Sequence, residues 1–277
     1  SGEQVYRRKR RDRVCMPTGV SWTNETWKPI TGCSRVSEGC RHCYAERLSL
    51  ERGWSQFPWT AQHAMDNIKI HPDRLNKPFT WKQPRMIFVN SMSDMFHELV
   101  SPRFLDDIFD VIQRCPQHTF QILTKRPERA LTWSETNELP ANVWIGTSVE
   151  DRRVVQRIDH LRRIQATVRF ISFEPLIGSV GMLDLRGIQW AIVGGESGED
   201  FRPMDHAWAR EIRDQCVAAK VAFFFKQDAS KRSGVRPLLI EADGSQTEWQ
   251  QFPGDAGRPE LPQDSHADSE WVQVRMF

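Results

Sequence analysis

The sequence predicts an α/β fold: a partial, TIM-like (β/α) barrel of about six to seven parallel strands, with a small C-terminal β-hairpin extension. Two observations support this prediction. Short β-rich runs are continuously apolar rather than alternating, as strands buried on both faces of a parallel sheet require. Helical patterns lie between these runs, at about 25 to 30 residues per strand–helix unit, which is typical of right-handed βαβ units. Such units build a doubly wound sheet or a barrel.

Six apolar runs predict the strands, and a first short strand is expected ahead of the cysteine-rich loop at 33–43. The six runs are "MIFVN" (86–90), "TFQIL" (119–123), "VWIGT" (143–147), "VRFISF" (168–173), "WAIVG" (190–194) and "VAFFF" (221–225). Their content of β-branched and aromatic residues favours strands over short buried helices.

Helices are predicted between the strands from apolar residues spaced at i, i+3, i+4 and i+7. Ser101 and Pro102 are a fitting cap and first-turn pair for one of them. Asp205 can cap another, a third follows the fourth strand and includes Val154, and a helical run begins at Tyr44.

Three segments are expected along the chain. Residues 1–20 form a basic, flexible N-terminal arm, 21–228 the barrel with the three-cysteine loop, and 229–277 a hairpin turned at Asp243-Gly244 with a Pro/Gly/acid-rich extension. The arm carries "YRRKRRDR", which is either a solvated tail or a contact for a phosphate backbone.

The composition is that of an ordinary soluble globular protein, with 39% hydrophobic and 27% charged residues. There is no apolar run of about 18 residues and no secretory leader pattern, so the prediction is a cytoplasmic protein without membrane association. The net charge of +2 does not by itself indicate a nucleic-acid partner. In a reducing compartment, clustered cysteines more often bind metal or do chemistry than form disulfides.

Polar and charged residues stand directly after each predicted strand from 86–90 onward. Because the loops after parallel barrel strands converge at one rim, this pattern favours a catalytic or ligand-binding rim. The alternative is that loops are polar everywhere and that Ser, Asp and Glu cap helices. The residues concerned are Ser91, Ser93, Asp94, His97, Thr124, Lys125, Arg126, Ser148, Glu150, Glu174, Glu196, Ser197, Arg202, Lys226 and Gln227.

The segment "VGGESG" (193–198) places two glycines at the end of the predicted strand 190–194. Gly194 and Gly195 could let a ligand approach the backbone, and Glu196 could then pair with an ammonium group. A tight strand-to-loop turn explains the glycines equally well.

Cys33, Cys40 and Cys43 have the spacing C-x6-C-x2-C, which leaves three interpretations open. A structural zinc site needs four protein ligands, and no second C-x2-C pair is present. Unliganded thiols would invite oxidation. A [4Fe–4S] cluster on three thiolates would keep one iron open, and S-adenosylmethionine (SAM) can chelate such an iron. Cys115 and Cys216 are expected to be buried thiols, and Cys15 lies in the irregular N-terminal segment.

The chain resembles the phage Gp37/Gp68-like, three-cysteine-motif (DUF5131-type) proteins of unassigned function from Trp22 to about Pro253. The motifs that carry the resemblance are "TWKPITGCSRVSEGCRHCYAE", "VNSMSDMFHE", "ILTKRPER", "WIGTSVED", "SFEPLIG", "IVGGESG" with "RPM", and "FFFKQ". The resemblance implies a radical-SAM-like partial barrel and a companion protein encoded nearby. Radical SAM enzymes usually have C-x3-C-x2-C with an aromatic residue before the last cysteine, where this chain has a wider gap and His42.

The leading hypothesis is a radical-SAM-like iron–sulfur enzyme that modifies or repairs a nucleic acid or nucleotide. Tryptophans that look exposed (Trp22, Trp27, Trp54 and Trp59) would stack on bases, although they could equally pack the core. One alternative is a non-catalytic adaptor, stabilised by an iron–sulfur cluster or zinc, that works with the companion protein. Another is hydrolytic or photochemical nucleic-acid repair with a structural cluster.

Roles follow from this hypothesis. The cluster ligands are Cys33, Cys40 and Cys43. The expected cofactor-binding residues are Gly194, Gly195, Glu196, Ser197, Ser148 and Tyr44, the last as a contact for adenine. The expected catalytic residues are Glu150, Glu174 and Lys125, and the expected substrate-binding residues are Asp94, Arg126, Arg202, Lys226 and Gln227. The cationic residues Lys125, Arg126, Arg202 and Lys226 would hold phosphates or carboxylates of a ligand.

Overall fold

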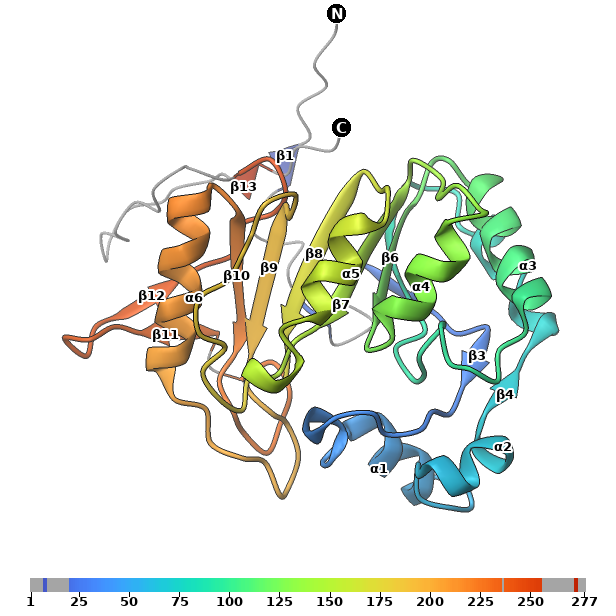
Figure 1. Ribbon diagram of the computed structural model, residues 1–277, viewed down its shortest axis with the longest axis horizontal. Coiled ribbons are helices and arrows are strands. Elements are labelled where there is room, and N and C mark those ends of the chain that lie inside the picture. The colour runs from blue at the N-terminus through green and yellow to red at the C-terminus, as the bar shows by residue number, and fades with distance from the viewer. Residues whose placement is uncertain (1–6, 9–19, 236, 256–271, 274–277) are drawn as a thin grey trace, which may run out of the picture.

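The computed structural model describes residues 7–8, 20–235, 237–255 and 272–273. Its main element is a sheet of seven strands in the order β10-β9-β8-β7-β6-β5-β2, in which every neighbouring pair is parallel. The sheet curls into a half-barrel (Figure 1), which confirms the predicted α/β partial barrel. The strands are β2 (Glu25–Trp27), β5 (Met86–Val89), β6 (Thr119–Thr124), β7 (Val143–Ser148), β8 (Val168–Phe173), β9 (Trp190–Gly194) and β10 (Ala222–Gln227).

Helices α3 to α6 cover the outer face of the sheet, as Figure 1 shows. They connect successive strands except β8 and β9, which are joined by the helix-free segment 174–189. Their bounds are α3 (Pro102–Gln113), α4 (Pro127–Ser134), α5 (Arg157–Arg163) and α6 (His206–Ala219). Both predicted caps are confirmed: Phe104 N donates to Ser101 Oγ at 3.2 Å, and Ala207 N donates to Asp205 Oδ1 at 2.8 Å. The helix expected around Val154 begins later, because 152–154 form a separate short 3-10 helix, η6 (Arg152–Val154).

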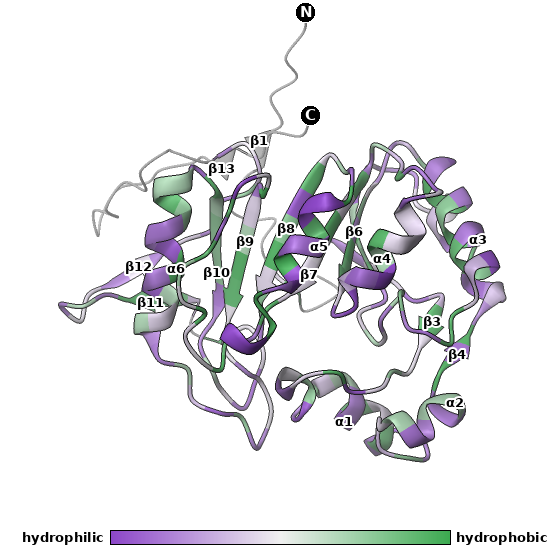
Figure 2. Ribbon diagram, viewed as in Figure 1, coloured by the Kyte–Doolittle hydropathy of each residue, from purple (hydrophilic) through white to green (hydrophobic). Residues whose placement is uncertain are grey.

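Alternation of side chains along each strand produces two separate cores. Outward-facing residues such as Ile122, Ile145 and Val193 pack under the helices in one large apolar cluster, to which the buried thiols Cys115 and Cys216 belong as predicted. In Figure 2 the strands are largely green and the outer helices carry purple faces. The helices therefore follow the expected pattern of one apolar face on the sheet and one polar face in solvent.

Inward-facing residues at the amino ends of the strands form an aromatic plug inside the half-barrel. The plug contains Trp22, Phe88, Phe170, Trp190 and Phe224, with the rings of Trp22 and Phe88 4.8 Å apart. The prediction that Trp22, Trp27 and Trp59 are exposed is wrong, since they are at most 3% exposed; Trp54, at 53%, is exposed as predicted. Large aromatic side chains were needed to fill a lumen that the open sheet does not close by itself.

The predicted C-terminal hairpin is confirmed as β11 (Leu238–Ile240) and β12 (Gln246–Glu248), with Gly244 at a φ of +84° in the turn. The chain then runs along the open edge of the sheet. Phe225 N donates to Trp249 O at 2.7 Å, and Phe252 packs on the Trp190 ring at the base of the lumen. The hairpin segment therefore protects the β10 edge from pairing with another chain.

Shorter elements complete the described chain. They are β3 (Ile30–Thr31), β4 (Lys69–Ile70), α1 (Tyr44–Glu51), α2 (Ala64–Asn67) and the 3-10 helices η2 (Glu38–Cys40), η3 (Ala61–His63), η4 (Pro72–Arg74) and η5 (Lys77–Thr80). The two-residue strands β1 (Arg7–Arg8) and β13 (Val272–Gln273) pair with each other. The rest of the predicted arm, including Cys15, and most of the predicted extension lie outside the described residues. Across the described ranges, no helix is long and apolar enough to span a membrane.

Candidate functional site

A cavity of about 590 Å³ opens at the carboxyl ends of the strands. Figure 1 shows α1 and α2 facing these ends, so the segment between β2 and β5 covers the mouth of the half-barrel. Most of the predicted site residues line the cavity: Cys33, Cys40, Cys43, Tyr44, Asp94, Lys125, Arg126, Ser148, Glu174, Gly195, Glu196, Ser197, Lys226 and Gln227. Three predicted residues do not line it, namely Glu150, Gly194 and Arg202.

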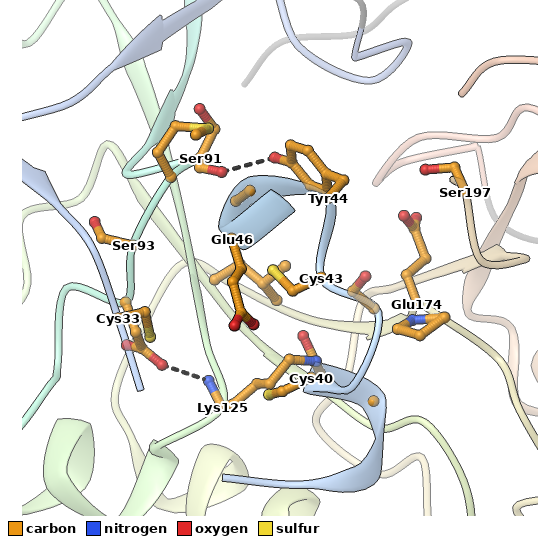
Figure 3. Close-up of a pocket in the computed structure, with 18 of the residues that line it drawn as sticks. Cys33, Cys40, Cys43, Tyr44, Glu46, Ser91, Ser93, Lys125, Glu174 and Ser197 are labelled. Carbon is orange, nitrogen blue, oxygen red and sulfur yellow. Dashed lines mark hydrogen bonds between the residues drawn. The ribbon is translucent and has the colours of Figure 1, made fainter. Parts of the chain in front are cut away.

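The three cysteines lie on one loop and face a common space (Figure 3). Cys33 follows β3, Cys40 ends η2, and Cys43 is the N-cap residue of α1. Burial raises the pKa of Cys33 to about 12, and burial also raises the pKa of Cys43. A thiolate at either position therefore needs nearby positive charge, such as a bound metal would provide.

Two cations of the protein already lie beside these sulfurs. Arg126 Nη1 donates to Cys33 Sγ at 3.7 Å, and the charge of Lys125 lowers the pKa of Cys43 against the effect of burial. Within the part of the chain that the structure describes, no three His, Cys, Asp or Glu side chains form a group that could hold a metal ion.

Glu150 binds the cysteine loop to the rim, although it does not itself line the cavity. Ser37 Oγ donates to both carboxylate oxygens of Glu150 at 3.2 Å, and Lys125 and Arg157 pair with the same carboxylate. A Cβ on Gly39 would lie 2.2 Å from Glu150 Cγ, so only glycine lets the loop pack this closely. Glu150 is 1% exposed and its charge is already matched, which suits a positioning role better than the predicted catalytic one.

Glu196 makes a second link to the cysteine loop. Its carboxylate accepts hydrogen bonds from the backbone N, Nε and Nη2 of Arg202 at 2.6 to 3.0 Å, and its Oε2 lies 3.1 Å from His42 Nδ1. Arg202 also donates to Glu38 at 3.1 Å. The protein itself thus engages both carboxylate oxygens of Glu196, so the predicted pairing with an ammonium group of a ligand would compete with these contacts.

Asp94 and Arg126 tie the loop after β5 to the end of β6. Asp94 accepts hydrogen bonds from Phe96 N, Thr124 Oγ1 and Lys125 N, and from Arg126 Nη1 at 3.3 Å. Both side chains of the pair are at most 8% exposed. Arg126 is therefore committed to Asp94 and to the sulfur of Cys33 rather than free to bind a phosphate.

The glycines at the end of β9 are explained by contacts within the protein. A Cβ on Gly195 would lie 2.2 Å from Ala229 N, and one on Gly194 would lie 3.2 Å from Glu174 Cδ. The absence of a side chain at both positions is thus explained by close packing within the protein, and Gly195 still lines the cavity. Gln227 is likewise occupied, since its amide donates to Gly195 O and accepts from Ser233 Oγ and Gly234 N.

Glu174, Lys226 and Tyr44 complete the wall. Lys226 Nζ donates to Glu174 Oε2 at 2.6 Å, while Tyr44 Oη donates to Ser91 O at 2.7 Å (Figure 3). Tyr44 is thereby held at the cavity with its ring available, which is compatible with the predicted contact to a planar group.

The comparisons with known proteins agree with the motif pattern. A family model described as "Protein of unknown function (DUF5131)" matches residues 17–253. The chain belongs to this family.

One solved structure with detectable similarity is titled "Spore photoproduct lyase complexed with dinucleoside spore photoproduct". The identity is 10% and the TM-score 0.35, and the match covers 67% of this chain and 58% of that chain, so it spans less than two thirds of that protein's length. No curated protein matches the sequence significantly.

Two residues of the site, Asn90 and Glu46, were not predicted from the sequence. Asn90 directly follows β5 and has a φ of +60°, and its Oδ1 accepts from Ile30 N at 3.1 Å. An Asn directly after a buried strand could have indicated this turn, because Asn tolerates the left-handed region of backbone conformation. Glu46, 4% exposed, accepts from Arg35 and from Trp59 N and so orders the segment after α1. It stands in the quoted "CYAE", but nothing in the sequence reveals its distant partner.

Proposed function

We propose that this chain is an iron–sulfur enzyme of radical-SAM-like type that acts on a nucleic acid or nucleotide. The observation that carries the proposal is the position of Cys33, Cys40 and Cys43 on one loop that faces the cavity of a parallel half-barrel at its carboxyl rim. Barrel enzymes place their chemistry at this rim.

The donor set fits the expected cluster. Three thiols are ligands that iron–sulfur clusters use, and each would bind a separate iron, so the three side chains need not converge on a single ion. A bound [4Fe–4S] cluster would supply an electron and an open iron position at which SAM could bind. Arg126 and Lys125 would offset part of the thiolate charge, and a hydrogen bond to a ligand sulfur of this kind raises the reduction potential.

The rest of the site would keep the loop in place. Glu150 holds it through Ser37, and Glu196 holds it through His42 and Arg202. These ties come from β7 and β9, so the loop is fixed to two different strand ends. Loop and rim together would exclude water from the cavity floor.

The nucleic-acid part of the proposal is supported by unpaired positive charge at the cavity. Lys28, at the end of β2, lines the cavity and has no carboxylate partner among the residues that the structure describes. Burial and the charges of Lys77 and Arg74 lower its pKa, so the ammonium group would be stabilised by an anionic ligand. Phosphate groups are such ligands.

A spectroscopic experiment tests the proposal. The protein, purified without oxygen, should show the visible absorption of an iron–sulfur cluster and, after reduction, an EPR signal that changes when SAM is added. A colourless protein that carries zinc contradicts the proposal. A cluster whose EPR signal does not change with SAM would support the iron–sulfur site but contradict a radical SAM reaction.

Cysteine variants test the ligand assignment. Cys40→Ala should abolish the cluster absorption, because two thiolates rarely hold a [4Fe–4S] cluster. Cys115→Ala is the matched control, since this thiol lies in the helix-covered core away from the cavity. Loss of iron from the Cys115 variant with correct folding would show that the ligands are misassigned.

A companion-binding adaptor is the second candidate. The observation that favours it is a group of exposed apolar side chains on the segment covering the cavity mouth, namely Leu50, Trp54, Phe57 and Met65. Such a group is typical of protein contact sites. An adaptor of this kind would bind its metal without any response to SAM, so the same spectra separate the two candidates.

A further inference from the structure

The ion pair of Glu174 and Lys226 spans three strands of the half-barrel. Glu174 follows β8 and Lys226 lies in β10, and the two side chains meet over β9, which lies between them in the sheet. They can meet there because Gly194 at the end of β9 has no side chain: its Cβ would lie 3.2 Å from Glu174 Cδ. The pair is thereby held at the cavity wall in one geometry.

This pair leaves hydrogen-bonding capacity unused. Glu174 Oε2 accepts from Lys226, but Glu174 Oε1 is buried and has no partner among the described residues. Buried polar atoms are normally paired, so unpaired ones on a cavity wall indicate a ligand.

The opposite charges of Glu174 and Lys226 favour a neutral ligand over an anionic one. A phosphate would meet the carboxylate of Glu174 beside the ammonium of Lys226, so the phosphate-binding role predicted for Lys226 is disfavoured here. A neutral group with an N–H donor next to an acceptor would instead satisfy Glu174 Oε1 and a second N–H of Lys226.

Part of the cavity lining is apolar. Trp22, Phe88 and Leu123 line the cavity and belong to the aromatic plug or pack against it. Planar rings gain dispersion contacts on such a surface, while their polar edges need partners at the side.

We propose that this wall binds the hydrogen-bonding edge of a nucleobase, with Glu174 as acceptor, Lys226 as donor and the aromatic plug beneath the ring. The inference rests on the proposed function and names the part of the substrate that the cavity recognises. Watson–Crick edges of nucleobases carry an N–H donor beside an acceptor, which is the pattern that the pair leaves open.

Calorimetric titration with adenosine, guanosine, cytidine, uridine and thymidine tests the proposal. At least one nucleoside should bind to the full-length protein, and ribose alone should not. Glu174→Gln should weaken that binding at least tenfold, because the open oxygen loses its charge and can be replaced by an N–H. Lys226→Met should also weaken it. Equal binding of ribose, or no binding of any nucleoside at millimolar concentration, would overturn the proposal.

Glu241→Gln provides the matched control. Glu241 pairs with Arg213 outside the cavity, and the two side chains are 18% and 14% exposed, against 16% and 14% for Glu174 and Lys226. This variant also loses a half-buried ion pair, so it should match Glu174→Gln in thermal stability but bind nucleosides like the wild type. If both variants weaken binding equally, the effect is one of stability and the assignment fails.

A protein with Cys33, Cys40 and Cys43 all replaced by Ser separates this inference from the proposed function. Nucleoside binding should persist in it, since the wall contains no cysteine. Titration in the presence of SAM then identifies the occupant: retained binding supports a substrate base, whereas displacement by SAM would assign the wall to the cofactor and overturn the proposal.

Discussion

Two glycines show how close packing, rather than a turn, can require the smallest residue. A Cβ on Gly146 in β7 would lie 2.5 Å from the Phe170 ring of β8, and a Cβ on Gly39 would lie 2.2 Å from Glu150. Neither glycine has the positive φ that marks a backbone requirement. Their need for glycine comes from neighbours on other elements, so it could not be read from the local sequence.

His97 is the residue with the clearest dependence on pH. Leu99 N donates to His97 Nδ1 at 3.1 Å, and His97 Nε2 lies 2.8 Å from Ser34 Oγ. Burial and Arg126 lower the pKa of His97 to about 4, against the opposing effect of Glu98 and Asp94; Arg129 adds to the lowering. The neutral ring is therefore the form that the fold stabilises.

We expect the free energy of unfolding to fall as the pH is lowered from about 6.5 to about 4. In this pH range the unfolded chain takes up a proton on His97 that the folded chain does not take up. The contribution of neutral His97 to the free energy of unfolding is therefore complete above pH 6.5 and lost below pH 4. Denaturant titrations should show that the free energy of unfolding of His97→Gln falls less over this pH range than that of the wild type. The difference should be on the order of 1 to 3 kcal/mol. An unchanged pH profile for His97→Gln would contradict the expectation.

The charged residues of the rim show that a ligand-binding role cannot be predicted for each residue separately. Lys125, Arg126, Arg202 and Lys226 were expected to hold phosphates or carboxylates of a ligand, and the structure pairs each of them with a carboxylate of the protein. Apart from Glu196 and Arg202, the paired residues are far apart in the sequence. Charges that look free in a motif are therefore matched once the strand ends meet.

Buried polar groups help to hold the connections after the strands together. Asp94, 6% exposed, is the clearest case, because it accepts from the backbone and side chains of both its own loop and the end of β6. The segment from Asn90 to His97 thus depends on one carboxylate for its geometry, which predicts a large effect of its removal.

Asp94→Ala should destabilise the protein by about 3 to 5 kcal/mol, since it leaves the buried guanidinium of Arg126 with one partner fewer. Chemical denaturation measures this loss. Asp110→Ala removes an ion pair with Arg114 on α3 whose side chains are 61% and 62% exposed, and should cost less than about 0.5 kcal/mol. A loss for Asp94→Ala as small as that of the control would show that the carboxylate does not organise the rim.

Both ends of the described barrel region contribute to closing its base. Trp22 enters the lumen before β2, and Phe252 enters it after the hairpin, with its ring 5.2 Å from Trp190 and 5.5 Å from Phe224. An open half-barrel exposes its inner face, so segments outside the seven strands must cover it.

Phe252→Ala should lower stability by about 2 kcal/mol, because it removes a partly buried ring from the base of the lumen. Calorimetric unfolding checks this value. Phe57→Ala, at a position that is 38% exposed, should cost less than about 1 kcal/mol. An unchanged melting temperature for Phe252→Ala would mean that the segment after the hairpin does not close the barrel.

Local patterns were sufficient to predict the strands, their parallel direction, the two helix caps and the hairpin turn. The reason is physical: continuous apolar runs, caps and turn residues act within a few positions of the chain. The three-cysteine loop was also visible as a spacing pattern, and the polar rim followed from the rule that parallel strands end at one edge.

Contacts between distant segments determined everything else. The burial of Trp22, the contact of Glu196 with His42, and the packing of Glu150 against Gly39 depend on which segments become neighbours. Burial and charge pairing are properties of that three-dimensional neighbourhood, so a side chain's freedom to bind a ligand cannot be read from its place in a motif.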